Sequence, residues 1–424
     1  MLTTRNQVTS TIGRRNETYL RGLNALSPPK EDGFRTLSCS SYISSDNSSL
    51  DNSIEIPDHF SSPEGLQFCG LTVKASQEIY NRFLSSDNTF QTELDTFALG
   101  YIEAKAAEKN AILVSDDWDG ALTHMGITRR KRDALLKDEH KEFRMLGTAE
   151  TWAKEIVKDM YEWLLNLDNA ITECGKHKSQ RSTNLTRSGS PGPSVTPSRA
   201  IKPASRPTSS SGQLPYPVVE SSVVIPQDVS EHTFIYKGGL TSRLEKVWAD
   251  ETSNALEFPN IYSTPPTDFH PQNPHILYFT KQKQVAEKYA KLQDDTKNPV
   301  SICILHVAVP KDILSQATPI FGTDFKQLVF ESRLPNPRGR LSADLQRYAN
   351  ASLLVGPVCG QASDHLQRHV RDAAGVELMT LPRGESASQY GFQGNEMADT
   401  LNEKCKGKVW LEELQSRGVG RWRK

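Results

Sequence analysis

Long hydrophobic runs are missing from this sequence of 424 residues. No stretch approaches the ~18–20 apolar residues of a membrane-spanning helix, and the first residues contain no apolar core of a secretory signal. The six cysteines are scattered, and no two are close enough for a Cys-x-x-Cys pair. This disfavours a zinc site and a disulfide framework. We therefore expect a reduced intracellular protein of the cytoplasm or, alternatively, of the nucleus, with no contact to a membrane.

An excess of charge of one sign is also missing. The 50 Lys and Arg residues nearly balance the 51 Asp and Glu residues, and the formal net charge is -1. This balance disfavours a uniformly basic protein, so the sequence gives no strong signal of nucleic-acid binding. Hydrophobic residues make up only 36% of the chain, and its mean hydropathy is -0.54. Both values are low for a globular chain, so part of the sequence is expected to stay unfolded.

Three segments contain few of the apolar residues that a core requires. Residues 1–61 are polar and rich in serine, and we expect a disordered leader. Residues 175–230 are expected to form a disordered basic linker. Of residues 175–219, 21 are Ser, Thr or Pro, 7 are Lys or Arg, and none is acidic. Residues 415–424 are expected to form a basic tail.

Residues 62–174 are expected to form a helical module. Helices are indicated at 74–83 and 91–110, and the clearest pattern covers residues 148–173. In that last segment large apolar residues recur at steps of one helix face: Trp152, Ile156, Val157, Met160, Trp163, Leu164 and Leu167. This face can pack on the C-terminal domain, on the module itself or on a second chain, and the sequence leaves these alternatives open.

Three polar clusters have a functional and a structural interpretation. Residues 129–132 form a basic run, which fits a nuclear-import signal but inside a helical segment is typical of a solvated face. His365 and His369 have the i,i+4 spacing of zinc proteases, but Leu366 replaces the general base, so we expect an exposed helix and no metal site. A third cluster lacks the spacing of a calcium loop and favours a helix start: Asp116, Asp117 and Asp119.

After residue 230 the sequence changes to short β-rich runs separated by helical pieces. Strands are expected at 233–237, 276–280, 300–309, 327–332 and 352–355. Helices are expected at 240–248, 282–292, 342–349 and 394–405, with a last element at 409–414. This alternation predicts an α+β domain over residues 231–414, so the whole chain is expected to be α+β.

Three of these segments carry a recognisable pattern. Residues 234–239 read Phe-Ile-Tyr-Lys-Gly-Gly, residues 276–280 read Ile-Leu-Tyr-Phe-Thr before a helix, and residues 325–331 read Phe-Lys-Gln-Leu-Val-Phe-Glu. In this order residues 233–333 resemble the ADP-ribosyltransferase superfamily. Residues 233–414 also resemble a group of uncharacterised fungal proteins, which share the Tyr-Phe-Thr segment and a later Val-Cys-Gly segment.

The resemblance implies an ADP-ribosyltransferase-like fold with NAD as the cofactor. Tyr236, Lys237 and Gly238 stand where the family's first strand holds the NAD ribose or a phosphate. Tyr278 and Phe279 stand at the second motif, where an aromatic ring stacks on the nicotinamide. The residue types alone also fit a strand whose side chains alternate between core and surface, followed by a glycine turn.

The catalytic positions depart from the family pattern. Gln327 stands where a later strand bears the family's catalytic Glu, and a neutral amide supplies no negative charge. Glu331 would share its strand face but lie about 13 Å away, at ~3.3 Å per residue. We therefore hypothesise nucleotide or protein binding through a degenerate cleft. The alternatives are an active NAD-dependent mono-ADP-ribosyltransferase and a protein-binding scaffold whose cleft is filled.

Overall fold

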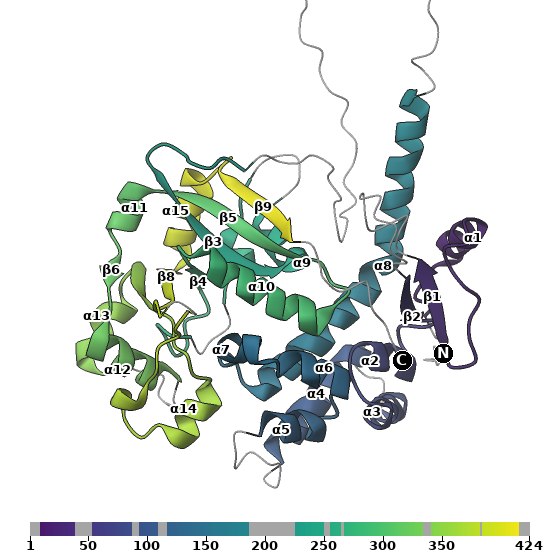
Figure 1. Ribbon diagram of the computed structural model, residues 1–424, viewed down its shortest axis with the longest axis horizontal. Coiled ribbons are helices and arrows are strands. Elements are labelled where there is room, and N and C mark those ends of the chain that lie inside the picture. Colours follow the sequence, from purple (N-terminus) through teal and green to yellow (C-terminus); the bar gives the residue numbers. More distant parts are fainter. Residues whose placement is uncertain are drawn as a thin grey trace, which may run out of the picture.

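The computed structural model confirms the α+β class and shows a mainly helical N-terminal part beside a part in which sheets and helices alternate (Figure 1). The residues that the structure describes are 9–38, 53–86, 93–108, 117–185, 225–249, 255–263, 267–333, 341–381 and 384–414. Most of the predicted linker, from 186 to 224, and the predicted tail at 415–424 lie outside the described residues.

Part of the predicted leader is folded, so the expectation of disorder is wrong for residues 9–38 and 53–61. Helix α1 (Arg14–Gly22) precedes two paired antiparallel strands, β1 (Phe34–Ser38) and β2 (Ser53–Pro57). This segment has few apolar residues, but it adds them to a core that the later helices supply. Its buried members in that core include Leu20, Leu37 and Ile56.

The helical part follows as α2 (Pro63–Phe68), α3 (Val73–Ser85), α4 (Leu94–Ala107), α5 (Trp118–His124), α6 (Arg129–Leu135), η1 (Asp138–His140), α7 (Lys141–Arg144) and α8 (Ala149–Leu185). The predicted helices at 74–83, 91–110 and 148–173 are confirmed. The Asp117 side chain accepts a hydrogen bond from the Gly120 N–H at 2.8 Å, which confirms the helix start predicted for the acidic cluster.

Helix α8 is longer than the sequence pattern predicts. It continues to Leu185, so residues 175–185 are helical and the expected linker begins later. The composition that suggested a linker is an average over residues 175–219, and every proline of that segment follows residue 190. Although α8 has 37 residues, neither it nor another helix in the described ranges is long and apolar enough to cross a membrane.

Two sheets form the α+β part (Figure 1). The first has the antiparallel order β3-β5-β9, with β3 (His232–Leu240), β5 (Ile302–Pro310) and β9 (Val409–Leu414). The second has the order β4-β8-β7-β6, with β4 (Ile276–Phe279), β8 (Ser388–Gln393), β7 (Leu353–Pro357) and β6 (Thr318–Pro319). The strands predicted at 233–237, 276–280, 300–309 and 352–355 are therefore confirmed.

Short helices connect these strands: α9 (Thr241–Leu244), η2 (Glu245–Val247), η3 (Phe258–Ile261), α10 (Lys283–Lys297), α11 (Lys311–Ser315), α12 (Gly322–Arg333), η4 (Ala343–Leu345), α13 (Gln346–Ala349), α14 (Ser363–His369), η5 (Ala373–Gly375) and α15 (Asn395–Lys404). The strand predicted at 327–332 is wrong, because this segment belongs to α12. Its buried residues Phe325, Leu328, Val329 and Ser332 follow helical spacing.

Helix α10 joins the two parts of the molecule. It packs against β3 and β5 and also against α6, α7 and α8. One buried apolar cluster contains Trp152 and Met160 of α8 together with Ala290 and Leu292 of α10. The apolar face of α8 therefore packs partly on the α+β part, which is the first of the three alternatives left open by the sequence.

The basic run at 129–132 is not a uniform solvated face. Lys131 on α6 is 6% exposed, and its Nζ donates a hydrogen bond to the carbonyl of Thr296, in the last turn of α10, at 2.8 Å. Burial, together with the positive charges of Arg130 and Lys297, lowers the pKa of Lys131 to about 7. Lys131 is thus a buried contact between the two parts.

We expect this lysine to make stability depend on pH. Its pKa is about 7 in the folded chain and 10.5 ordinarily, so between these values the unfolded chain binds more protons and stability rises with pH by at most about 1.4 kcal/mol per unit. Urea unfolding of wild type and Lys131→Met at pH 6 to 10 measures this. The difference in unfolding free energy should shift in favour of wild type above pH 7, and a difference that is constant with pH would contradict the assignment.

Candidate functional site

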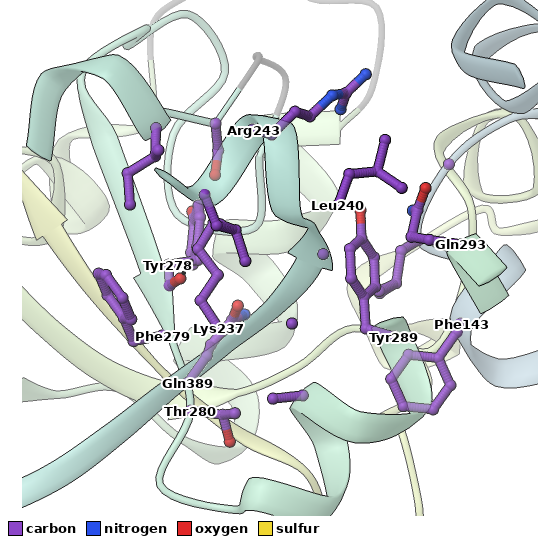
Figure 2. A pocket seen from close by; sticks show the side chains of 18 of the residues that line it. Phe143, Lys237, Leu240, Arg243, Tyr278, Phe279, Thr280, Tyr289, Gln293 and Gln389 are labelled. Carbon is purple, nitrogen blue, oxygen red and sulfur yellow. Dashed lines mark hydrogen bonds between the residues drawn. The ribbon is translucent and has the colours of Figure 1, made fainter. Parts of the chain in front are cut away.

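A cavity of about 600 Å³ lies between the helical part and the α+β part. Its walls come from α8 and the turn before it, from β3 and β4, and from α9 and α10. Figure 2 shows Lys237, Tyr278 and Phe279 together at one end, and Tyr289, Gln293 and Phe143 together at the other. This volume is typical of sites for small molecules and cofactors.

The cavity exists because β3 and β4 separate. The backbone of Tyr236 exchanges two hydrogen bonds with that of Thr280, at 2.7 and 2.9 Å, and this bridge is the one described between the two sheets. Beyond it β3 continues to Leu240 beside β5, whereas β4 continues beside β8. The cavity lies where the two strands diverge, beside residues 237–240 of β3 and beside Tyr278 and Phe279 of β4.

Five of the seven predicted site residues line this cavity: Tyr236, Lys237, Gly238, Tyr278 and Phe279. The Lys237 Nζ donates to the Tyr278 carbonyl at 3.3 Å and lies 5.9 Å from the centroid of the Phe279 ring. Burial, reinforced by the charge of Arg243, lowers the pKa of Lys237 to about 8, and no carboxylate in the described part of the chain offsets this. The cavity therefore holds a cation without an anionic partner among these residues.

The aromatic residues at this end differ in exposure. Phe279 is 2% exposed and packs its ring against Phe258 and Phe392, at centroid distances of 6.1 and 6.0 Å, so it is a core residue. Tyr278 is half-buried, and its hydroxyl accepts a hydrogen bond from the Phe269 N–H at 3.2 Å. Burial raises the pKa of Tyr278. A neutral, fixed phenol ring is thus available to the cavity.

Tyr236 and Gly238 have structural explanations. The Tyr236 ring packs edge-on against His306, at a centroid distance of 5.1 Å. Gly238 lies where β3 meets α10, and a Cβ atom placed on it would be 1.9 Å from the carbonyl oxygen of Ala286. The close approach of a helix therefore accounts for this glycine without a ligand.

Gln327 and Glu331 are not part of the cavity. They lie one turn apart on α12, where the Gln327 Nε2 donates to Glu331 Oε1 at 2.9 Å. The other Glu331 oxygen accepts from the Ser342 N–H at 2.7 Å. The expected 13 Å separation along a strand face is therefore wrong, because the segment is helical. The structure does not bring these two side chains to Lys237 and Tyr278.

A charged pair that the sequence pattern missed lines the cavity instead. Arg333 Nη2 lies 2.5 Å from Asp268 Oδ1, and Asp268 Oδ2 accepts from the Gln389 side chain at 2.6 Å and from the Cys359 N–H at 3.0 Å. Gln389 stands on β8, the later strand that pairs with β4. Asp268 and Arg333 are 65 residues apart, so no local spacing could reveal the pair. All three side chains are buried, and the carboxylate is neutralised by its ion pair with Arg333.

The opposite wall carries carboxylates that are also paired. Arg243 Nη2 donates to Asp159 Oδ1 at 2.6 Å and its Nη1 lies 3.7 Å from Glu155. Burial would raise the pKa of Glu155, but the charges of Lys297 and Arg243 outweigh burial and lower it. The same carboxylates hold the pKa of Arg243 above its ordinary value despite burial. Glu155 is therefore ionised, and both carboxylates are paired with Arg243 within the wall.

Within the described residues, one trio of side chains has the spacing of metal ligands. Glu139, His140 and Asp295 bring ligand atoms within 4.8 Å of one another. Lys291 Nζ lies 2.6 Å from Glu139, and Lys137 Nζ lies 2.9 Å from Asp295, so both carboxylates already bond ammonium groups. This trio is best explained as an ion-pair network between η1 and α10.

The histidine pair of α14 stands apart from that trio. The His365 and His369 rings are 4.8 Å apart, as expected for one helix face. Within the described ranges, no third ligand group comes together with them.

Comparisons of the chain with protein-family models, with curated proteins and with solved structures gave no match. The function is therefore argued from the geometry of the cavity.

Proposed function

We propose that this chain binds a nucleotide-sized anionic ligand, of the class of ADP and NAD, in the cavity between its two parts. The observation that carries the proposal is Lys237, a cation without a carboxylate partner among the described residues, at the wall of a 600 Å³ cavity. A phosphate group would supply the missing negative charge. Tyr278 beside it offers a ring surface of the kind that such ligands use.

Binding without transferase chemistry is favoured over the active enzyme. A transferase of the resembled family needs an available carboxylate beside the ribose. The cavity is lined by Glu155, Glu162 and Asp268, and each is paired with a lysine or arginine side chain. Gln327 lies on α12, away from the cavity, so Gln327→Glu is expected to create no NAD turnover. The scaffold alternative requires a filled cleft, which disagrees with a volume of about 600 Å³.

A titration with ADP and NAD, followed by the unfolding temperature and by calorimetry, tests the proposal. A ligand at 100 times its Kd is expected to stabilise the fold by about 2.7 kcal/mol. Lys237→Met should weaken ADP binding about tenfold, which corresponds to one charge-assisted hydrogen bond of about 1.4 kcal/mol. The matched control is Lys311→Met, because Lys311 is exposed on α11 outside the cavity. No response to millimolar ADP or NAD would refute the proposal.

The pH dependence provides a second readout of the same experiment. Because the pKa of Lys237 is lowered to about 8, the free lysine loses its proton, and with it the attraction for phosphate, as pH rises through this value. ADP affinity of the wild type should therefore fall between pH 7 and pH 9. The affinity of Lys237→Met should stay nearly constant over this range. A parallel fall in both proteins would place the titrating group elsewhere.

A further inference from the structure

Gln293 carries an unpartnered polar atom at the far end of the cavity. It lies on α10, lines the cavity and is 2% exposed. Its Oε1 atom has no hydrogen-bond partner in the structure. An amide oxygen that is buried without a donor costs about 1–3 kcal/mol, so this acceptor calls for a donor, and a ligand in the cavity can supply one.

Aromatic side chains lie around Gln293, and the charges of Glu155 and Arg243 act on the nearest of them, Tyr289. The Tyr289 hydroxyl, one turn earlier on α10, lies beside the Gln293 side chain. The Tyr289 ring lies 6.4 Å from that of Trp152, which belongs to α8. All three rings of Trp152, Tyr289 and Phe143 line the cavity, and Figure 2 shows Tyr289 and Phe143 at the same end as Gln293. An aromatic ring of a ligand would therefore find apolar contact here, with the acceptor Oε1 beside it.

Resting on the proposed function, we infer that Gln293 selects a nucleotide whose base carries an amino group, as adenine does. The base would lie at the Tyr289 end of the cavity, with its amino N–H donating to Gln293 Oε1. The phosphates would lie toward Lys237. Adenine fits this end of the cavity because its exocyclic amino group is a donor on the edge of a flat ring. The cavity wall supplies the acceptor Gln293 Oε1 beside aromatic side chains.

Calorimetric titration with two ligands tests this inference. The probes are ADP and purine riboside 5′-diphosphate, which has the same phosphates and ring but lacks the amino group. Wild type is expected to bind ADP about tenfold more tightly, the effect of one hydrogen bond to an otherwise unpaired acceptor. Gln293→Met, which keeps the side-chain length, should bind both ligands equally. Gln316→Met is the matched control, because Gln316 is exposed directly after α11 and lies outside the cavity.

The possible results separate the two proposals. Equal binding of both ligands by wild type would overturn the role of Gln293 and leave the nucleotide site intact. A preference for ADP that persists in Gln293→Met would also overturn the role of Gln293, because another residue would then bind the amino group. Binding of neither ligand would overturn the proposed function and this inference together. The comparison of ligands on wild type remains decisive even if the variant fails to fold.

Discussion

Replacement of Asp159 by Asn is expected to lower the free energy of unfolding by about 3–5 kcal/mol, the range found when one partner of a buried ion pair is removed. The side chain of Asp159 is 2% exposed and that of Lys297 is fully buried. The Lys297 Nζ donates to Asp159 Oδ2 at 2.5 Å, and Arg243 donates to the other oxygen at 2.6 Å. Asn keeps the shape but turns an N–H₂ group toward one of two cations.

The loss of the Asp159 carboxylate is expected to separate the helical part from the α+β part. Asp159 stands on α8, whereas Arg243 and Lys297 stand on α9 and α10. Glu155, which lies 3.1 Å from Lys297, is the remaining anion of the cluster and is more exposed. One carboxylate then faces two cations across the interface between the parts. We therefore expect undocking of α8 to accompany the loss of stability.

Urea unfolding followed by tryptophan fluorescence and by circular dichroism measures both effects. A single cooperative transition at lower urea would indicate that the parts still unfold together. Two transitions would indicate that they separate first. Glu103→Gln is the control, because Glu103 is 69% exposed in its pair with Lys154, and exposed pairs contribute about 0–1 kcal/mol. A loss below 1 kcal/mol for Asp159→Asn would contradict the buried network.

The sequence predicts those helices and strands whose buried residues recur at one regular spacing or form a continuous run. Helix α8 and strands β3, β4 and β5 were predictable because their apolar residues repeat at helical spacing or form continuous runs, as in β5, where nearly every residue is buried. The strand predicted at residues 327–332 was wrong because a short apolar run fits a strand or a buried helix equally well. Strand β8 was not predicted, because its buried residues include Gln389, Gly391 and Gln393. Glycine is depleted in strands and glutamine is mostly exposed in proteins.

The residues of the candidate site also fall into two groups, those that belong to a local sequence motif and those that only packing brings together. Lys237 and Tyr278 were predictable because each belongs to a local motif on one strand. Asp159 and Lys297 are 138 residues apart, and Asp268 and Arg333 come from separate segments, so packing alone brings these pairs together. Gln293 gives no signal in the sequence, since its position on α10 matters only after α8 closes the other side of the cavity.

The second large effect is expected at Gly238. A Cβ atom there would lie 1.9 Å from the Ala286 carbonyl oxygen and 2.7 Å from its carbon, and these are backbone atoms of α10 that no rotamer change can move. Gly238→Ala must therefore push α10 away from β3. Overpacking of this kind costs typically about 1–3 kcal/mol and occasionally more, and we expect the upper end because the obstacle is a helix backbone.

This substitution also distinguishes a structural glycine from a ligand-binding one. Gly100→Ala is the matched control, because Gly100 lies within α4, nothing is within 4 Å of its added Cβ, and Ala in a helix is favoured over Gly by up to about 1 kcal/mol. In urea unfolding we expect a marked loss for Gly238→Ala and none for Gly100→Ala. Since α10 also carries Tyr289, Gln293 and Lys297, its displacement should weaken ADP binding and the contact with Asp159 together. Unchanged stability with lost ADP affinity would mean instead that Gly238 serves the ligand directly.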